Sequence, residues 1–217
     1  MWYFYGGVGR IRKKKGGLRK VGTRTKMSRQ LELYFELTLD RIHGPADLMR
    51  RFRIGRRMLQ RDLKDLRDSG LIRVRYDHKK DDYVQAGDAI FDESASDRRR
   101  EHLLRLYRIG TLITQLPVTS WHSIDRYEMG LREYADYLDY AKEDPENNPP
   151  EDYGDMYAFF VPDPPVFYDL KSAYHALFPS CSHRTRERDF REMRNAGFGI
   201  FYSRHYKTYI YLDPEES

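Results

Sequence analysis

Apolar residues recur at helical spacing in the first third of the chain. Between Arg29 and Ile42 they fall at intervals that place them on one face of a helix. The run His43-Gly44-Pro45 then ends this helix and begins a second one over residues 46–52, because proline is tolerated at the first helical position. The pattern predicts two consecutive helices separated by a tight turn.

A third helix and a hairpin follow. Leu59, Leu63 and Leu66 stand at i, i+4 and i+7, which indicates a helix over residues 55–69 with one apolar face, ending at Ser69-Gly70. Residues 72–85 then alternate between apolar and polar around the turn 77–82, as a β-hairpin does. The predicted order is helix, helix, helix, hairpin.

The other face of the third helix is cationic. A solvated helix face usually mixes both charge signs, whereas this face has cations and one amide at the start of a helix that follows a turn. Such a helix suits the major groove, where Arg reads guanine, Gln reads adenine, and further cations neutralise phosphates. The residues expected to contact DNA here and in the hairpin are Arg56, Arg57, Gln60, Arg61, Lys64, Arg73, Arg75, Lys79 and Lys80.

The run from Ile54 to Leu63, followed by Leu66 and Ser69-Gly70-Leu71, resembles the N-terminal winged helix-turn-helix of DeoR-like and WYL-type bacterial transcription regulators. The resemblance covers Met27 to about Val84. It implies a recognition helix over 55–69 and a wing over 72–85. The chain departs from the family at Gly55, where the family has a capping Ser or Thr, and no WYL domain is recognisable.

The chain also repeats itself. Residues 188–198 match residues 61–71 at a separation of 127 residues. The first segment reads Arg-Asp-Leu-Lys-Asp-Leu-Arg-Asp-Ser-Gly-Leu, and the second reads Arg-Asp-Phe-Arg-Glu-Met-Arg-Asn-Ala-Gly-Phe. Residues 199–202 and 209–212 then flank a polar turn, which predicts a second wing. Two copies of one supersecondary unit are stronger evidence than one, and they predict a second winged unit.

Two differences between the copies bear on DNA binding. Arg186 stands where Leu59 supplies a core residue, and Glu187 stands where Gln60 faces outward. A carboxylate near phosphates opposes binding, so the favoured interpretation is a copy that kept the fold and became a dimerisation or docking unit. The alternative is that Arg184, Arg188 and Arg204 still contact DNA.

Four segments are expected. Residues 1–26 form a basic tail, 27–86 a winged-helix DNA-binding domain, 97–164 a helical and acidic connecting region, and 165–217 the second winged unit. Helical patterns over 97–116 and 123–141 each suit the first helix of that second unit, with the other as an insertion. Residues 142–155 read as a loop. The fold class is therefore mainly α with small β-wings, an α+β fold with tandem winged helices.

The aromatic residues beyond position 150 permit two interpretations. They suit a core or a dimer interface, which is favoured, or the lining of an effector pocket. The residues concerned are Tyr153, Tyr157, Phe159, Phe160, Phe167 and Tyr168. A small-molecule effector is compatible with a regulator, but no residue pattern supports one.

Charge is distributed unevenly. The formal net charge of +5 combines +9 in residues 1–26, +4 in 27–86, −9 in 87–164 and +1 in 165–217. The argument for nucleic acid therefore rests on local clustering more than on the overall charge. The tail is expected to be disordered, and it is interpreted as a basic arm along DNA, a targeting segment, or upstream sequence ahead of a start at Met27.

Signals for catalysis and for metal binding are weak. The sequence has no P-loop, no dinucleotide-binding glycine motif and no His-Glu-x-x-His, and its single cysteine excludes an internal disulfide. In the run 121–125, His, Ser and Asp are adjacent, but adjacency is not triad geometry, and Ser123 suits a helix cap. No catalytic role, metal or cofactor is predicted.

The sequence thus predicts a DNA-binding, cytoplasmic and nucleoid-associated transcriptional regulator of bacterial type, with no membrane span. Its partners are double-stranded DNA and a second copy of the chain, because one winged helix buries little DNA. The homodimer is expected to form through residues beyond 97 and to bind a palindromic site. The alternatives are a replication initiator of a plasmid or mobile element, and a winged-helix protein-interaction module that does not bind DNA.

Overall fold

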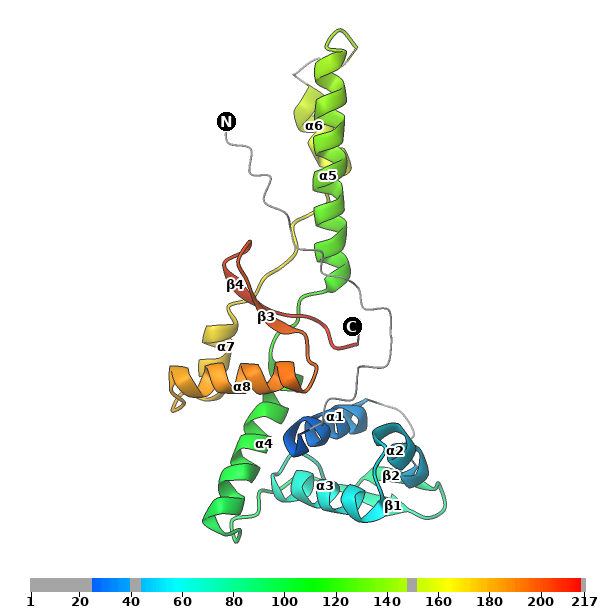
Figure 1. Ribbon diagram of the computed structural model, residues 1–217, viewed down its shortest axis with the longest axis vertical. Coiled ribbons are helices and arrows are strands. Elements are labelled where there is room, and N and C mark those ends of the chain that lie inside the picture. The colour runs from blue at the N-terminus through cyan, green and yellow to red at the C-terminus, as the bar shows by residue number, and fades with distance from the viewer. Residues whose placement is uncertain (1–24, 40–43, 148–151, 216–217) are drawn as a thin grey trace.

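The computed structural model describes residues 25–39, 44–147 and 152–215. Within them the chain is mainly helical, with two small antiparallel hairpins, which confirms the predicted α+β class (Figure 1). Of the predicted tail, residues 1–24 lie outside the described residues. Residues 40–42 of the first predicted helix lie outside them as well. The helices are α1 Lys26–Thr38, α2 Pro45–Phe52, α3 Arg56–Asp68, α4 Asp97–Gln115, α5 Trp121–Glu143, α6 Tyr153–Phe160, α7 Leu170–Leu177 and α8 His183–Asn195.

The two hairpins follow α3 and α8. Strand β1, Val74–Asp77, pairs with β2, Asp82–Gln85, and strand β3, Ile200–Ser203, pairs with β4, Thr208–Tyr211. Both pairs are antiparallel and contain four residues in each strand. The two predicted hairpins are confirmed as secondary structure.

The two copies of the repeat have the same local structure. Helices α3 and α8 both contain 13 residues and begin 127 positions apart. Each ends at a glycine with positive φ, 76° at Gly70 and 95° at Gly197, a backbone conformation that glycine adopts without steric cost. The amide of the next residue then donates back to the helix, from Leu71 to Leu66 and from Phe198 to Met193.

Helix α4 supplies the first helix of the second copy. Its Ile109 and Leu112 are fully buried in one apolar core that also contains Leu31 of α1, Leu63 of α3 and Phe190 of α8. Helix α4 therefore lies in the core and contacts α8, which favours α4 over α5 for the first helix of the second copy. Helix α7, Leu170–Leu177, provides the remaining short helix of the copy and was not anticipated from the sequence.

Helices α5 and α6 pack on each other and extend away from the rest of the molecule, at the top of Figure 1. Gly130 allows this close approach, because a Cβ atom there would overlap the Phe160 carbonyl oxygen. Helix α6 falls partly within the segment expected to be a loop, and none of its residues is buried. We call α5 and α6 together the arm. Its aromatic residues do not form the core of the chain.

Candidate nucleic-acid interface

The cationic face predicted for the third helix lies on the outside of α3. Leu59, Leu63 and Leu66 are buried, whereas all five polar residues selected from the sequence are exposed. Arg67 is exposed as well and extends the same surface, although it was not selected. The α3 face is thus formed by Arg56, Arg57, Gln60, Arg61, Lys64 and Arg67.

The acidic residues of α3 contact other helices and do not dilute this face. Arg29 of α1 holds Asp62 through two hydrogen bonds, Nε to Oδ2 at 2.6 Å and Nη2 to Oδ1 at 3.1 Å. Arg99 of α4 binds Asp65 at 2.9 Å and Asp68 at 2.6 Å. Although α3 has five Lys or Arg and three Asp, its carboxylates are therefore neutralised by neighbouring helices, with Lys64 also pairing with Asp68 at 2.8 Å.

A buried amide connects two of these carboxylates. Gln30 is fully buried, and its Nε2 donates to Asp62 Oδ1 at 3.1 Å and to Asp65 Oδ2 at 2.9 Å. Its Oε1 then faces His102 Nε2 at 3.1 Å, so this ring nitrogen is the donor. The network fixes α1, α3 and α4 relative to one another, and it therefore holds the α3 face in a defined orientation.

The network also shifts the ionisation of its members. Burial would raise the pKa of Asp65, but hydrogen bonds from Lys26 and Gln30 and the charges of Lys26 and Arg99 outweigh burial and lower it. Burial lowers the pKa of His102, assisted by the charge of Lys26. Asp65 is therefore held as a carboxylate and His102 as a neutral ring near pH 7.

A hollow of about 570 Å³ lies beside the α3 face. Five of its lining residues are cationic, and two are the aspartates already paired with neighbours. The excess of positive charge among these residues suits an anionic group such as a phosphate. Its lining residues are Lys26, Arg29, Met58, Arg61, Asp62, Lys64, Asp65 and Arg99.

The first hairpin adds exposed cations next to α3. Lys79 and Lys80 lie in its turn and are exposed, as is Arg75 on β1. The Lys79 amide donates to Asp77 Oδ1 at 2.9 Å, which shapes the turn. Arg73 is also exposed, but its Nη1 donates to the Asp88 carbonyl at 3.1 Å, so it is partly engaged by the following loop.

The hairpin and the helix form neighbouring parts of one surface. Burial raises the pKa of Tyr83 on β2, and the charges of Arg67 and Arg56 on α3 oppose this rise. The hairpin packs beside α3, because Ile72 and Val74 are buried in the same apolar core as Leu63 and Leu66. The structure thus places the first hairpin next to α3, with the selected cations of both elements exposed.

Two further residues selected from the sequence, Arg184 and Arg188, lie on α8 and are exposed. They belong to the second copy of the repeat and not to the surface of α3 and β1–β2. Sequence reasoning missed the inward-facing acids of α3 and their partners on α1 and α4. The available signal was the spacing of Asp62 and Asp65, three residues apart on the side of the helix that carries Leu59 and Leu66.

The run 121–125 has a structural explanation. Ser120, and not Ser123 as predicted, caps α5, because the Ser123 amide donates to Ser120 Oγ at 3.4 Å. Ser123 Oγ in turn donates to the Ser120 carbonyl at 2.9 Å. Among residues 25–39, 44–147 and 152–215, no group of three or more His, Cys, Asp or Glu side chains could hold a metal ion.

Comparison of the chain with protein-family models, with curated proteins and with solved structures found no match. In the part of the chain that the structure describes, no helix combines the length and the apolar character needed to cross a membrane.

Proposed function

We propose that the chain binds double-stranded DNA through the α3 face and the β1–β2 hairpin, and that it acts as a sequence-specific transcriptional regulator of bacterial type, associated with the nucleoid in the cytoplasm. In this proposal the fold is a tandem winged helix, α3 is the recognition helix, and β1–β2 is its wing. The resemblance of residues 54–71 to DeoR-like and WYL-type regulators supports it.

The observation that carries the proposal is the separation of charge on α3. Asp62, Asp65 and Asp68 are neutralised by residues of α1, α3 and α4, while the cations and one amide remain at the surface. A helix stabilised only for solubility would gain from acid–base pairs on its exposed face. A uniformly cationic face costs self-repulsion, which a polyanionic partner relieves.

The proposal is tested by selecting binding sites for the full chain from a pool of random 30-base-pair duplexes. Recovery of a defined motif would support sequence-specific binding. Footprinting on the DNA upstream of its own gene then distinguishes the biological roles. Protection of a promoter site favours a regulator, and failure to enrich any motif and to bind the pool at low salt would refute DNA binding.

One observation favours a second role, that of a replication initiator of a plasmid or mobile element. Two similar units occur within one chain and share one apolar core. Such an arrangement suits direct repeats in an origin, and protection of such repeats in the footprint would select this role. A protein-docking module, the remaining alternative, predicts no protection at all.

A homodimer is also proposed, with the arm as its interface. On α4, Leu103 and Leu112 are fully buried within the chain, whereas Leu104 and Tyr107 are partly exposed, at 46% and 40%. The arm has the more exposed large apolar side chains, among them Phe159 at 78% and Tyr140 at 60%. Exposed clusters of this kind are common at interfaces between chains.

A further inference from the structure

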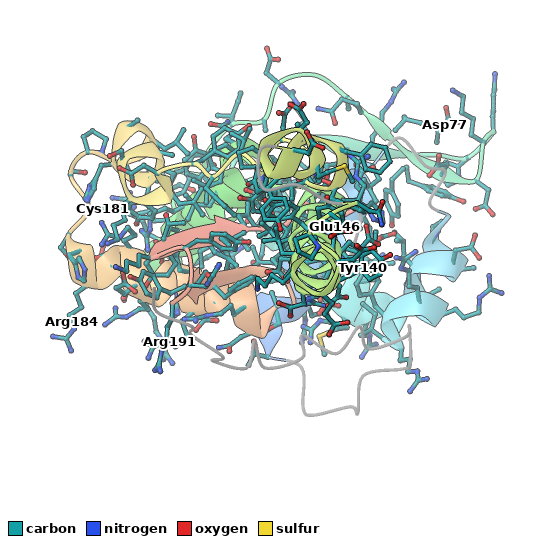
Figure 2. The ribbon with its side chains drawn as sticks, turned by 90° about the horizontal axis from the view of Figure 1, so that it is seen from above. Asp77, Tyr140, Glu146, Cys181, Arg184 and Arg191 are labelled. Atoms are coloured by element: carbon teal, nitrogen blue, oxygen red, sulfur yellow. The ribbon has the colours of Figure 1, made fainter. Side chains whose placement is uncertain are left out.

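A second cationic stripe runs along α8. Arg184, Arg188 and Arg191 stand at i, i+4 and i+7, so they share one face of the helix, and all three are exposed. Figure 2 shows Arg184 and Arg191 projecting away from the body of the protein. Among the ion pairs of the described residues, none involves these three side chains or the nearby Arg194.

The stripe repeats that of α3 position by position. At a separation of 127 residues, Arg57, Arg61, Lys64 and Arg67 correspond to Arg184, Arg188, Arg191 and Arg194. All four positions are cationic and exposed in both helices. Packing does not constrain exposed positions, so the shared positive charge requires another reason, and a common anionic ligand provides one.

The acidic residues of α8 do not oppose such a ligand. Asp189 is fully buried and bound by Arg108 of α4, and Glu192 pairs with Arg105 of α4 at 2.8 Å. As on α3, these carboxylates face neighbouring helices and the cations remain outside.

Glu187, which appeared to disfavour DNA, is satisfied within the chain. Its Oε2 accepts a hydrogen bond from the Tyr209 hydroxyl at 2.6 Å, and its Oε1 lies 3.4 Å from Arg186 Nη2. Arg186 is only 4% exposed and also contacts His175 Nε2 at 3.2 Å. Arg186 and Glu187 therefore pair with each other, with Arg186 buried and Glu187 partly exposed, and they leave the charge of the stripe intact.

Helix α4 fixes α8 relative to α3. Arg99 near its start binds Asp68 of α3, and Arg108 binds Asp189 of α8. Nine residues along a helix span about 14 Å, so α3 and α8 are attached to one short length of a single element. The common apolar core makes the same connection.

We infer that α8 is a second DNA-contacting helix, and that one chain engages two blocks of base pairs, one through α3 and one through α8. The inference rests on the proposed function and extends it. It replaces the interpretation of the second copy as a unit that has lost its DNA contacts. In the turn of the second hairpin, Tyr206 packs against Phe167 with ring centroids 4.2 Å apart, whereas Arg204 and Lys207 are exposed.

The test compares the full chain with the triple variant Arg184→Gln, Arg188→Gln, Arg191→Gln. Sites are selected from random 30-base-pair duplexes at a chain concentration and low salt at which light scattering shows a monomer, so that a second chain adds no block. The sites of the wild type are expected to contain two blocks, and the triple variant is expected to lose one. Binding to the two-block duplex should weaken at least tenfold. The slope of log K against log salt should become less steep by about 2.7, for three lost phosphate contacts.

Three controls separate the possible causes. The triple variant Arg126→Gln, Arg132→Gln, Lys142→Gln removes the same charge from α5 and should leave the two-block site and the slope unchanged. Replacing the three α8 arginines by Lys should restore the slope. Circular dichroism melting verifies that all variants fold, as expected for exposed positions.

The outcomes distinguish the inference from the proposed function. If the wild type selects a single block, or if the α8 variant binds like the wild type while Arg57→Ala weakens binding, the inference is overturned and the proposed function stands. If neither helix affects binding, both fail. An equal loss in the α5 control would indicate a general charge effect and would also overturn the inference.

Discussion

Arg108 of α4 holds Asp189 of α8 through two hydrogen bonds, one from Nε and one from Nη2 at 3.0 Å. The pair Arg29 and Asp62 makes the same two-pronged contact between α1 and α3. Asp62 and Asp189 are equivalent positions of the repeat, and both are fully buried. Each copy thus fixes its outward-facing helix to its first helix through a bidentate Arg–carboxylate pair, whose geometry defines orientation as well as attraction.

Removing the carboxylate of one pair should destabilise the protein strongly. Asp189→Ala leaves Arg108 without its partner and also removes the acceptor of the Tyr174 hydroxyl, which lies 2.8 Å from Asp189 Oδ2. Breaking a buried ion pair on one side costs about 3 kcal/mol or more. We expect a loss of this size in the free energy of unfolding measured with urea.

The control for this prediction is the more exposed pair of Glu192 with Arg105. Glu192→Gln should cost about 1 kcal/mol or less, since partly exposed pairs contribute little. Equal losses for Asp189→Ala and Glu192→Gln would contradict the assignment of Asp189 as an anchor.

The stability of the protein should fall as the pH drops below neutral. Burial lowers the pKa of His102. The charges of Lys26, Arg99 and Arg105 lower this pKa further, whereas the charge of Asp65 opposes the decrease. Below pH ~6.5 the unfolded chain therefore binds more protons than the folded one, so the free energy of unfolding decreases until the folded pKa is passed. His102→Gln should flatten this part of the stability profile, measured by urea unfolding from pH 7.5 to pH 5.

Asp65 acts in a separate and lower range of pH. Its pKa is lowered in the folded state because the hydrogen bonds and charges of Lys26, Gln30 and Arg99 outweigh burial. The contribution of Asp65 to the free energy of unfolding is present above its unfolded pKa of ~3.9. This contribution is lost as the pH falls through the pKa of Asp65 in the folded state. The slope of the free energy of unfolding against pH near pH 6 should respond to His102→Gln. If it changed with Asp65→Asn and not with His102→Gln, this assignment would be contradicted.

Local patterns were sufficient to predict the helix over 55–69 and the hairpin over 72–85, because their periodicity and turn residues are encoded in adjacent positions. The structure has α3 at Arg56–Asp68 and the strands within residues 74–85. The exposed cations followed from the same helical spacing. The repeat extended this success to α8 and to the second hairpin.

Long-range contacts decided what local patterns left open. The sequence offered two candidates for the first helix of the second copy, and the bonds from Arg105 and Arg108 to α8 select α4. The role of Glu187 likewise depends on Tyr209, which lies 22 residues further along the chain. Helix α6 was missed because aromatic residues favour strands and cores, whereas here they pack across α5 and α6, as Tyr134 does with Tyr157.

Gly130 should be essential for the packing of the arm. A methyl group there would overlap the Phe160 carbonyl oxygen, so Gly130→Ala must separate α5 from α6 and should cost roughly 1–3 kcal/mol. Gly154→Ala on α6 is the matched control, because no atom lies within 4 Å of its added Cβ, and alanine favours a helix by about 0.5–1 kcal/mol. Thermal melting and limited proteolysis of the arm should show opposite effects.

DNA binding should respond differently to the helix and to the wing. Arg57 lies in the first turn of α3 and is exposed, so Arg57→Ala should cost about 1–3 kcal/mol on the selected site and relax its sequence preference. Lys79→Ala and Lys80→Ala should weaken all sequences alike and reduce the salt slope by about 0.9 each. Unchanged specific binding by Arg57→Ala at fixed salt would show that α3 does not read bases.

Self-association should depend on the arm and increase with salt. Helix α5 contains six acidic and three basic residues, so two arms repel each other at low ionic strength while their exposed Tyr140 and Phe159 attract. Light scattering at micromolar concentration should therefore show a dimer that strengthens from 50 mM to 500 mM NaCl. The double variant Tyr140→Ser, Phe159→Ser should remain monomeric throughout, because it removes the two most exposed large apolar side chains of the arm. DNA binding by the monomeric variant should persist, since the arm is separate from α3 and α8.

A wild-type chain that stays monomeric over this whole range would refute the homodimer, and a dimer unaffected by the double variant would place the interface elsewhere.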